Sequence, residues 1–256
     1  MLGKLMKYDL KSMLKTIVPL WLTVIALSVI FAIKYWGGAA YNVDMGNDTV
    51  DLILFIILFS VALAIVVMNI LFIVQRFWNG LLKEEGYLMF TLPVTTRSLI
   101  MSKALSALVI SLGSLLVATI SISIFSFSFI QGAIHMGVFA DLWIETKNAL
   151  LLLQPSEIGE AIVFLLAGVT SFLNGIYQVY ASMAIGQLSN RNRFFLSFIA
   201  FVGITVVLSM FASLTDMFVF SNSLVNSCIS LLENVVLLVI FHGMTEVLLT
   251  RKLNLE

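Results

Sequence analysis

The chain has few of the side chains on which enzymes and disulfide-bonded domains depend. Its 256 residues include one cysteine, two histidines and three prolines, and only 11% are charged. The single cysteine, Cys228, excludes an internal disulfide and a metal site built from several cysteines. Basic and acidic residues balance at 14 each, so the overall charge predicts no nucleic-acid partner.

Motifs of several enzyme classes are also absent. No glycine-rich loop ends in Gly-Lys-Ser or Gly-Lys-Thr, and no Gly-x-Ser triplet of an intramembrane serine protease occurs. His135 and His242 do not have metalloprotease spacing. Glu84-Glu85 is similar to the paired glutamates of some membrane proteases, but it lies outside the apolar runs. We therefore predict no catalytic residue, no metal site and no bound cofactor on this chain.

Apolar residues are abundant instead. They make up 61% of the chain, and the mean hydropathy is +1.08. A core of this size could not hide so much apolar surface from water, so lipid must be the solvent. Runs of about 20 apolar residues cross the ~30 Å of hydrocarbon in a bilayer, and only helices satisfy their backbone hydrogen bonds there unaided. The predicted spans are 17–34, 52–75, 104–130, 161–188, 194–214 and 224–250.

The fold class predicted is therefore an all-α polytopic membrane protein, with residues 1–256 as a single transmembrane domain of six helices. The lysine-rich start followed by an apolar run is similar to a signal peptide. The run is longer than is typical of one, so we expect an uncleaved first span.

Lysine and arginine are distributed unevenly among the segments between these runs. Four fall in residues 1–16, four in 76–103, two in 189–193 and two at 251–252, which makes 12 of the 14. Only Lys34 and Lys147 fall on the other side. Because positive residues favour the cytoplasmic side, we predict that both termini and residues 76–103 are cytoplasmic, and that loop 131–160 is extracellular. No topology with an odd number of spans separates the charges as well.

The amino-terminal residues 1–16 have leucine and methionine every three or four positions among four lysines. This pattern predicts an amphipathic interfacial helix whose lysines meet anionic headgroups. Pro19 would then open the first span, where its missing amide hydrogen costs little. The loop at 131–160 is long enough for another interfacial helix, and residues 215–227 are compatible with a re-entrant or a surface turn.

Polar amides fall inside the second and fourth runs at Asn69, Asn174 and Gln178. Such residues more often join helices than bind cargo, although each is a candidate for a transport pathway. The fourth run also has small residues at heptad spacing, which predict the close approach of another helix: Gly168, Gly175 and Ser182.

The sixth run contains three titratable residues. His242 and Glu246 lie one turn apart near its end, where a proton-coupled carrier would need such a pair. A hydrogen bond from the helix end, with Glu246 bound to Arg251 or Lys252, is the simpler interpretation. Glu233 is expected about 27 Å from Arg251 along the helix, near the other headgroup layer.

The stretch 76–103 separates two apolar runs and mixes charged, aromatic and apolar residues. It cannot cross hydrocarbon, yet it is too apolar for a plain solvated linker. We interpret it as a short amphipathic element under the membrane that docks a soluble partner. Its charged side chains are Arg76, Lys83, Glu84, Glu85, Arg97 and Lys103.

Two parts of this stretch carry a family resemblance. Glu84-Glu85-Gly86-Tyr87, then Leu92-Pro93-Val94, then Arg97 and a Ser-Lys ending at Lys103 resemble the cytoplasmic coupling loop of type-2 ABC-transporter permeases. In that family a Glu-x-Gly and a Leu-Pro precede a Ser-Lys that opens the third span.

A second match follows the fourth run. Residues 184–188, Ala-Ile-Gly-Gln-Leu, precede Asn190, Arg191 and Arg193, as in the second cytoplasmic turn of the same family. The last residues, 252–256, are also similar to small permeases of Gram-positive bacteria. The resemblance covers the whole chain, and the joint order of the motifs is more specific than each one alone. The residues matched at the second turn are Gly186, Gln187, Asn190, Arg191 and Arg193.

The resemblance implies the permease subunit of an ATP-driven exporter in a bacterial cell membrane. Two permeases, identical or related, would sit on two cytoplasmic ATPase subunits, which would bind the ATP and Mg²⁺. A coupling helix between spans two and three would receive the push of ATP binding. The residues implied in coupling are Glu84, Glu85, Gly86, Tyr87, Leu88, Phe90, Leu92, Pro93 and Arg97. Pro93 would end this helix, and Thr95-Thr96 would start the next.

Other interpretations remain alongside this one. A proton-coupled secondary transporter would use His242 and Glu246, and a structural membrane adaptor would not need the charged loop. A loop resting on headgroups is disfavoured because an anionic surface would repel Glu84 and Glu85. Mostly apolar candidate lining with scattered serines suggests an antimicrobial peptide, a hydrophobic drug or a lipid-like cargo.

Overall fold

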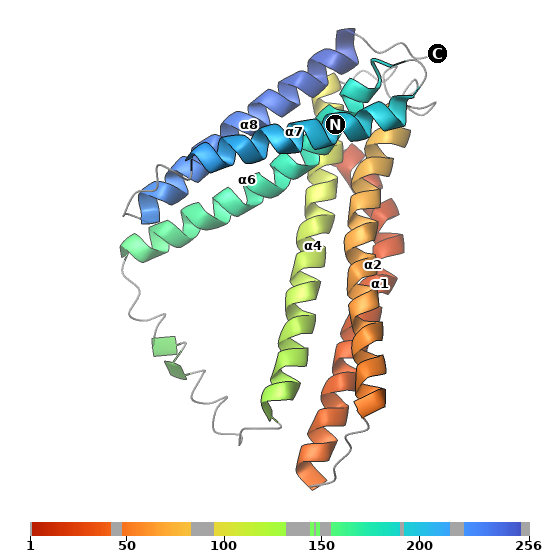
Figure 1. The fold of residues 1–256 in the computed structure, drawn as a ribbon, viewed down its shortest axis with the longest axis vertical. Coiled ribbons are helices and arrows are strands. Elements are labelled where there is room, and N and C mark those ends of the chain that lie inside the picture. The colour runs from red at the N-terminus through yellow and green to blue at the C-terminus, as the bar shows by residue number, and fades with distance from the viewer. Residues whose placement is uncertain are drawn as a thin grey trace. The chain divides into compact units, whose positions relative to one another are not determined.

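A computed structural model of the chain is helical in nearly all of the part it describes, which is residues 2–41, 48–82, 95–131, 144–145, 147–148, 155–189, 192–215 and 223–251. Figure 1 shows the elements in chain order. They are α1 (Leu2–Tyr41), α2 (Asp48–Phe77), the π-helix η1 (Trp78–Leu82), α4 (Thr96–Gln131), α6 (Pro155–Gly186), α7 (Arg193–Thr215) and α8 (Ser223–Arg251).

Six helices in the described chain are long and apolar enough to cross a membrane, which confirms the predicted all-α fold with six spans. Large apolar side chains stay exposed along them, with Phe59 at 61%, Phe164 at 69% and Val207 at 66%. Such surfaces are stable against lipid and not against water, so the chain is a multi-pass membrane protein. The candidate spans are Gly3–Lys34, Phe55–Leu81, Thr96–Ile124, Glu157–Gly186, Arg193–Thr215 and Ser223–Thr250.

The first helix corrects one predicted boundary. α1 runs without interruption for 40 residues, with Pro19 in its interior, so there is no separate helix over 1–16. At the usual rise this length is about 60 Å, twice the hydrocarbon thickness. Proline is tolerated inside membrane helices when other groups satisfy the backbone, and here the Thr23 hydroxyl donates a hydrogen bond to the Pro19 carbonyl at 2.7 Å.

Both described ends of the charged stretch 76–103 contain helix. Arg76 belongs to α2, η1 follows immediately, and α4 already begins at Thr96. Arg97 and Lys103 therefore lie on a helix. Helices can continue beyond an apolar run when their charged side chains find partners, and the partners of both residues are described below.

The helices form two compact units, which are best described separately. The first contains the described residues of Met1–Asp9, Phe72–Leu108 and Gln154–Glu256, and the second those of Leu10–Leu71 and Val109–Leu153. In the second unit α1, α2 and α4 meet at Ser114, whose hydroxyl accepts hydrogen bonds from Trp21 Nε1 and Asn69 Nδ2, both at 3.0 Å. Gly113 leaves room for the Trp21 side chain, because a Cβ at position 113 would lie 2.7 Å from the indole.

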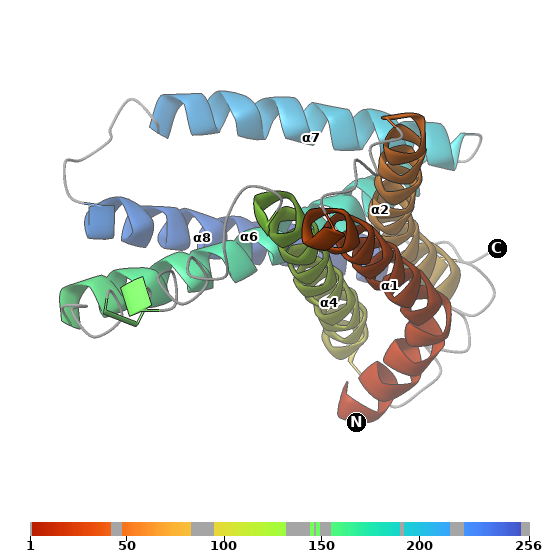
Figure 2. The same ribbon diagram turned by 90° about the horizontal axis from the view of Figure 1, so that it is seen from below.

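In the first unit α6 packs against both α7 and α8. Figures 1 and 2 show α6 and α8 running side by side. The core of this unit includes Tyr180 of α6, which is completely buried and stacks on Phe77 of α2 with ring centroids 4.3 Å apart. Two residues of the predicted small-residue stripe are not packed in this way. Gly168 and Gly175 have no atom of the described chain within 4 Å of where a Cβ would be.

Candidate functional site

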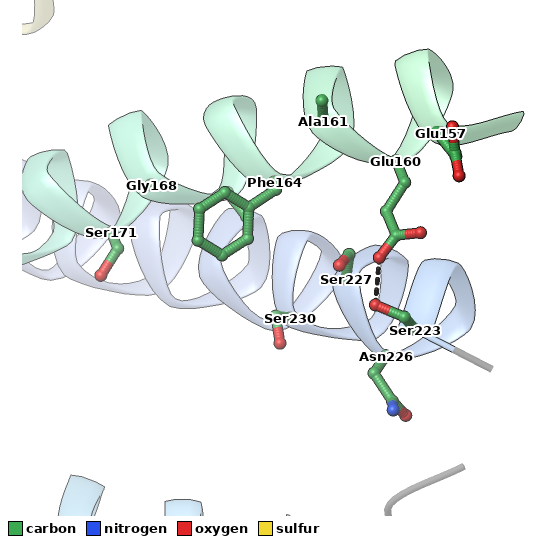
Figure 3. A pocket seen from close by; sticks show the side chains of 11 residues that line it. Glu157, Glu160, Ala161, Phe164, Gly168, Ser171, Ser223, Asn226, Ser227 and Ser230 are labelled. Atoms are coloured by element: carbon green, nitrogen blue, oxygen red, sulfur yellow. Dashed lines mark hydrogen bonds between the residues drawn. The ribbon is translucent and has the colours of Figure 1, made fainter. Parts of the chain in front are cut away.

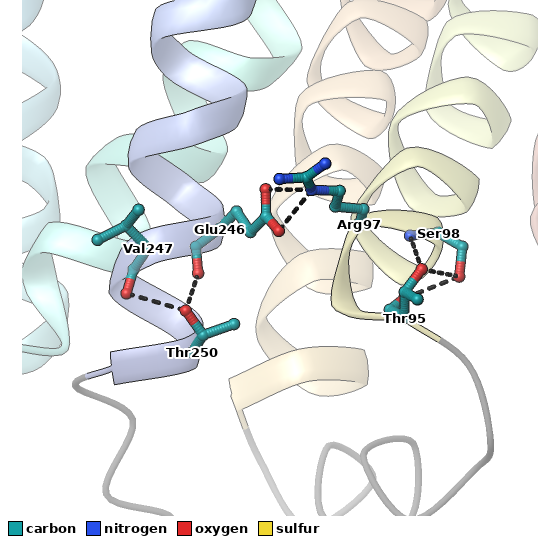
Figure 4. Close-up of polar contacts among 6 residues, drawn as sticks. All are labelled: Thr95, Arg97, Ser98, Glu246, Val247 and Thr250. Atoms are coloured by element: carbon teal, nitrogen blue, oxygen red, sulfur yellow. Dashed lines mark hydrogen bonds and ion pairs between the residues drawn. The ribbon is translucent and has the colours of Figure 1, made fainter.

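Hydrogen bonds at Thr95 define where α4 starts, immediately after the segment 83–94. Thr95 caps the helix as predicted, because the Ser98 amide donates to the Thr95 carbonyl at 2.9 Å and to its hydroxyl at 3.4 Å. The Ser98 hydroxyl also donates to the Thr95 carbonyl, at 2.8 Å. Threonine is a favoured cap because its side-chain oxygen accepts from an otherwise unpaired amide. The first turn of α4 is therefore capped by Thr95 (Figure 4).

Arg97 then joins the start of α4 to the end of α8. Its Nε donates to both carboxylate oxygens of Glu246, at 2.6 Å and 2.8 Å, as Figure 4 shows. The Arg97 side chain is 70% exposed and that of Glu246 is 21% exposed. The predicted partners of Glu246, Arg251 and Lys252, have side chains outside the described part of the chain, and within that part Glu246 binds Arg97. These two residues are separated by 149 positions in sequence.

His242 lies one turn before Glu246, and both side chains line one pocket. The pocket has a volume of about 370 Å³ and also includes Arg97, Met101 and Tyr177. The Tyr177 ring meets the His242 ring edge-on, with centroids 5.3 Å apart. His242 and Glu246 thus share a pocket, but Glu246 is already bound by a cation.

A second charged contact, the Asp9 cluster, consists of Asp9, Arg76 and Lys103. Lys103 Nζ donates to Asp9 Oδ1 at 2.9 Å, and Arg76 Nη1 donates to the same oxygen at 3.3 Å. Arg76 Nη2 also donates to the Asp9 carbonyl at 3.4 Å. The side chains of Lys103 and Asp9 are 4% and 10% exposed. A single carboxylate therefore holds the ends of three helices together.

The π-helix makes room for this cluster. A Cβ at Gly80 would lie 3.1 Å from Lys103 Cε and 3.2 Å from its Nζ, so a glycine leaves space for the lysine. Sequence reasoning missed Asp9 as a functional residue. The signal was present, because Asp9 is the only acidic residue before Asp44, within a lysine-rich segment. A lone acid among cations often marks a pairing site.

The second predicted cytoplasmic turn is partly visible. α6 ends at Gly186, and the Leu188 and Ser189 amides donate to the carbonyls of Ile185 and Gly186 at 3.0 Å and 3.2 Å. A Cβ at Gly186 would lie 2.6 Å from the Arg193 carbonyl oxygen and would collide with Ser197. Glycine is therefore required here, because the first turn of α7 lies against it. Gln187 is in the turn itself.

The amides inside the spans each have an interhelical partner. Asn174 Nδ2 donates to the carbonyl and the side-chain oxygen of Asn234 on α8, both at 2.8 Å. Gln178 Nε2 donates to the Thr205 hydroxyl on α7 at 2.8 Å. Asn69 bonds Ser114 in the second unit, as described above. Glu233 lies on α8, next to Asn234.

Most of the predicted coupling residues and part of the second turn lie outside the described residues. They are Glu84, Glu85, Gly86, Tyr87, Leu88, Phe90, Leu92, Pro93, Asn190 and Arg191. Among the described residues no group of three or more histidines, cysteines and acidic residues could hold a metal ion. The structure therefore describes the residues on either side of the segment 83–94.

Comparisons with known proteins add no relative. The chain matches no protein-family model, no curated protein and no solved structure.

The three basic residues that flank the segment 83–94 are all bound to acidic partners. Arg76 precedes the segment 83–94, and Arg97 and Lys103 follow it, and all three are bound within the same compact unit. Their acidic partners lie on α1 and α8. The residues that flank the segment are therefore connected to the start of α1 and the end of α8 as well as to α2 and α4.

Proposed function

We propose that the chain is the permease subunit of an ATP-driven exporter, working as a pair of permeases on two cytoplasmic ATPase subunits. The observation that carries this proposal is the Arg97–Glu246 contact. It links the residue that follows the charged segment 83–94 to a transmembrane helix distant in sequence. A helical membrane protein that takes force from a soluble motor needs such a link between its receiving segment and its spans.

The uneven distribution of basic residues supports this role. Twelve of the 14 basic residues fall on one predicted side, which supports a cytoplasmic location for both termini and the segment 83–94. The lysines of residues 1–16 would lie toward anionic headgroups as part of the continuous helix α1. Tyr87, Leu88, Phe90 and Leu92 would fill a cleft on the ATPase, and Glu84 and Glu85 would set its register.

The competing proton-coupled carrier receives less support. Such a carrier needs a carboxylate that gains and loses a proton during transport. Glu246 is instead held by two short hydrogen bonds from Arg97, and a guanidinium stays charged at all working pH values. A fixed ion pair of this kind favours a linking role for Glu246 over a proton-carrying one.

The proposal is tested by co-purification of the ATPase subunit. The full-length tagged chain, expressed in its native host and purified in mild detergent, is expected to retain an ATP-hydrolysing subunit. Scrambling residues 84–93 should remove that subunit while the permease still folds. A matched control scrambles the same number of residues in the loop 132–143, on the opposite predicted side. Failure of the full-length chain to retain any ATPase, in the presence and absence of a non-hydrolysable ATP analogue, would overturn the proposal.

A further inference from the structure

The pocket lined by Arg97, Tyr177 and His242 contains hydrogen-bond donors that the protein itself does not use. Arg97 binds Glu246 through its Nε alone, and its two terminal nitrogens make no hydrogen bond in the described part of the chain (Figure 4). The His242 ring packs against Tyr177, and neither ring nitrogen has a hydrogen-bond partner among the described residues. A guanidinium has five N–H donors, and an imidazole keeps at least one in either protonation state. These donors fit a ligand rich in acceptor oxygens.

The same pocket is charged at one end and apolar at the other. Its lining residues on α8 recur at steps of three and four, so they share one face of the helix: Leu238, Val239, His242, Gly243 and Glu246. Val239 and Glu246 are two turns apart, which is about 10 Å along the helix. Over that distance the lining changes from an ion pair to aliphatic side chains.

The charged end of the pocket lies where the membrane-spanning helices end. Arg97 is the second residue of α4, and Glu246 lies one turn before the last residues of α8. Long basic side chains at the ends of such helices reach the headgroups while their aliphatic part stays in apolar surroundings. The pocket therefore extends from the headgroup layer into the hydrocarbon.

The apolar end of the pocket is open to lipid. Val239 is 64% exposed and Met101 is 41% exposed. No described atom lies within 4 Å of where a Cβ at Gly243 would be, so no side chain fills the space beside that residue. An acyl chain could therefore lie in the pocket and remain continuous with the bilayer.

The charges at the pocket favour an anionic headgroup. Glu246 already has a cation at 2.6 Å, so a second cation has no free carboxylate to bind. Arg97 is the more exposed partner, and a headgroup at the surface therefore meets the guanidinium before the carboxylate. Guanidinium donors point in different directions, and a pair of them matches the oxygens of a phosphate. Arg97 can thus bind a carboxylate and a phosphate at the same time.

A second pocket in the same unit has the opposite character. It has a volume of about 710 Å³ and lies at the starts of α6 and α8, where its charged lining residues are Glu157 and Glu160 (Figure 3). Glu160 accepts a hydrogen bond from Ser223. No basic residue lines this pocket, so an anionic headgroup would find no cation there.

We propose that the pocket at Arg97 binds an anionic phospholipid. The phosphate would accept hydrogen bonds from the terminal nitrogens of Arg97 and from the ring N–H of His242, and an acyl chain would lie along Met101 and Val239. Basic pockets between membrane helices bind anionic headgroups in this way. The site goes beyond the proposed function and does not rest on it, because lipid binding needs no ATPase.

The experiment measures which lipid lies beside the pocket, by fluorescence quenching. In the full-length chain with Cys228→Ser, Val235→Cys carries a bimane dye one turn beyond Val239. A reference protein carries the dye on α7 through Val207→Cys, and both positions are exposed. Each protein is placed in phosphatidylcholine vesicles with a small fraction of nitroxide-labelled phosphatidylglycerol or nitroxide-labelled phosphatidylcholine. We expect the preference for the anionic lipid to be about fivefold greater at position 235 than at 207, as for one basic residue at an anionic lipid.

Two matched variants separate the arginine from its ion pair. Arg97→Gln and Glu246→Gln both remove the ion pair, but only the first removes the guanidinium. Arg97→Gln should lower the preference at position 235 to that at 207, whereas Glu246→Gln should keep or raise it. His242→Phe retains an aromatic ring against Tyr177 and loses the N–H donor, so it should lower the preference by about twofold.

A further arm distinguishes a lipid from a free anion. Inorganic phosphate, compared with chloride at equal ionic strength, should leave the quenching by phosphatidylglycerol at position 235 unchanged, because a free ion has no acyl chain to hold it in the pocket. Relief of quenching by phosphate and not by chloride would identify a free-anion site and overturn the lipid site.

Three other results would also overturn it: equal preference at the two dye positions, a preference kept in Arg97→Gln, or a preference lost equally in Arg97→Gln and Glu246→Gln. These measurements include no ATPase, so they leave the co-purification experiment unaffected. Conversely, a chain that retains no ATPase and still prefers phosphatidylglycerol at position 235 would keep the lipid site and lose the export role.

Discussion

Two ion-paired sites in the same unit differ in their burial. In the Asp9 cluster the lysine side chain is 4% exposed, and one carboxylate serves two cations. In the Arg97–Glu246 contact the arginine side chain is 70% exposed, and one cation serves one carboxylate. Removing one partner of a buried pair is strongly destabilising, whereas an exposed pair contributes little to stability. The first contact is therefore suited to holding helices together, and the second links the start of α4 to the end of α8 with little effect on stability.

The largest expected effect is at the Asp9 cluster. Asp9→Asn leaves Lys103 buried without a carboxylate and should lower the free energy of unfolding by about 3–5 kcal/mol. Thermal unfolding in detergent would measure the change. Lys103→Met should cost less, because Asp9 keeps Arg76, and the double variant should recover part of the loss. Lys7→Gln, on an exposed lysine of the same helix, is the control. A wild-type melting temperature for Asp9→Asn would refute the holding role.

A middle-sized effect is expected at the turn between α6 and α7. Gly186→Ala places a methyl group against the Arg193 carbonyl and the Ser197 side chain, so the start of α7 must shift. We expect a loss of about 1–3 kcal/mol, as for other overpacked sites. Gly203→Ala, with no described atom within 4 Å of the new methyl group, is the matched control. Equal melting temperatures of the two variants would show that the turn yields freely.

The smallest effect on stability, and the largest on coupling, is expected at Arg97. Arg97→Glu and Glu246→Arg should each change the free energy of unfolding by only about 0–1 kcal/mol. Each should uncouple transport from ATP hydrolysis in the assembled complex, and the double charge swap should restore coupling. Lys11→Glu makes the same charge change at an exposed residue of α1 and serves as the control. A destabilisation as large as that of Asp9→Asn would remove the distinction between the two sites.

The position of the spans could be predicted closely from the sequence. The fifth and sixth helices begin and end within one residue of the predicted spans, because the length of each apolar run and its flanking polar residues set where lipid begins. The helix start at Thr96 was also predictable, since a threonine cap is a local feature. Residues 1–16 were predicted as a separate helix and belong instead to the unbroken α1.

Composition and apolar run lengths alone determined that this is an all-α membrane protein with six candidate spans, since the transfer of side chains into lipid depends only on what each run contains. Only the tertiary structure decided which charges meet. Asp9 binds Lys103 across 94 positions, and Glu246 binds Arg97 across 149 positions. An ion pair depends on distances of a few ångströms between side chains, and those distances are set by how the helices pack.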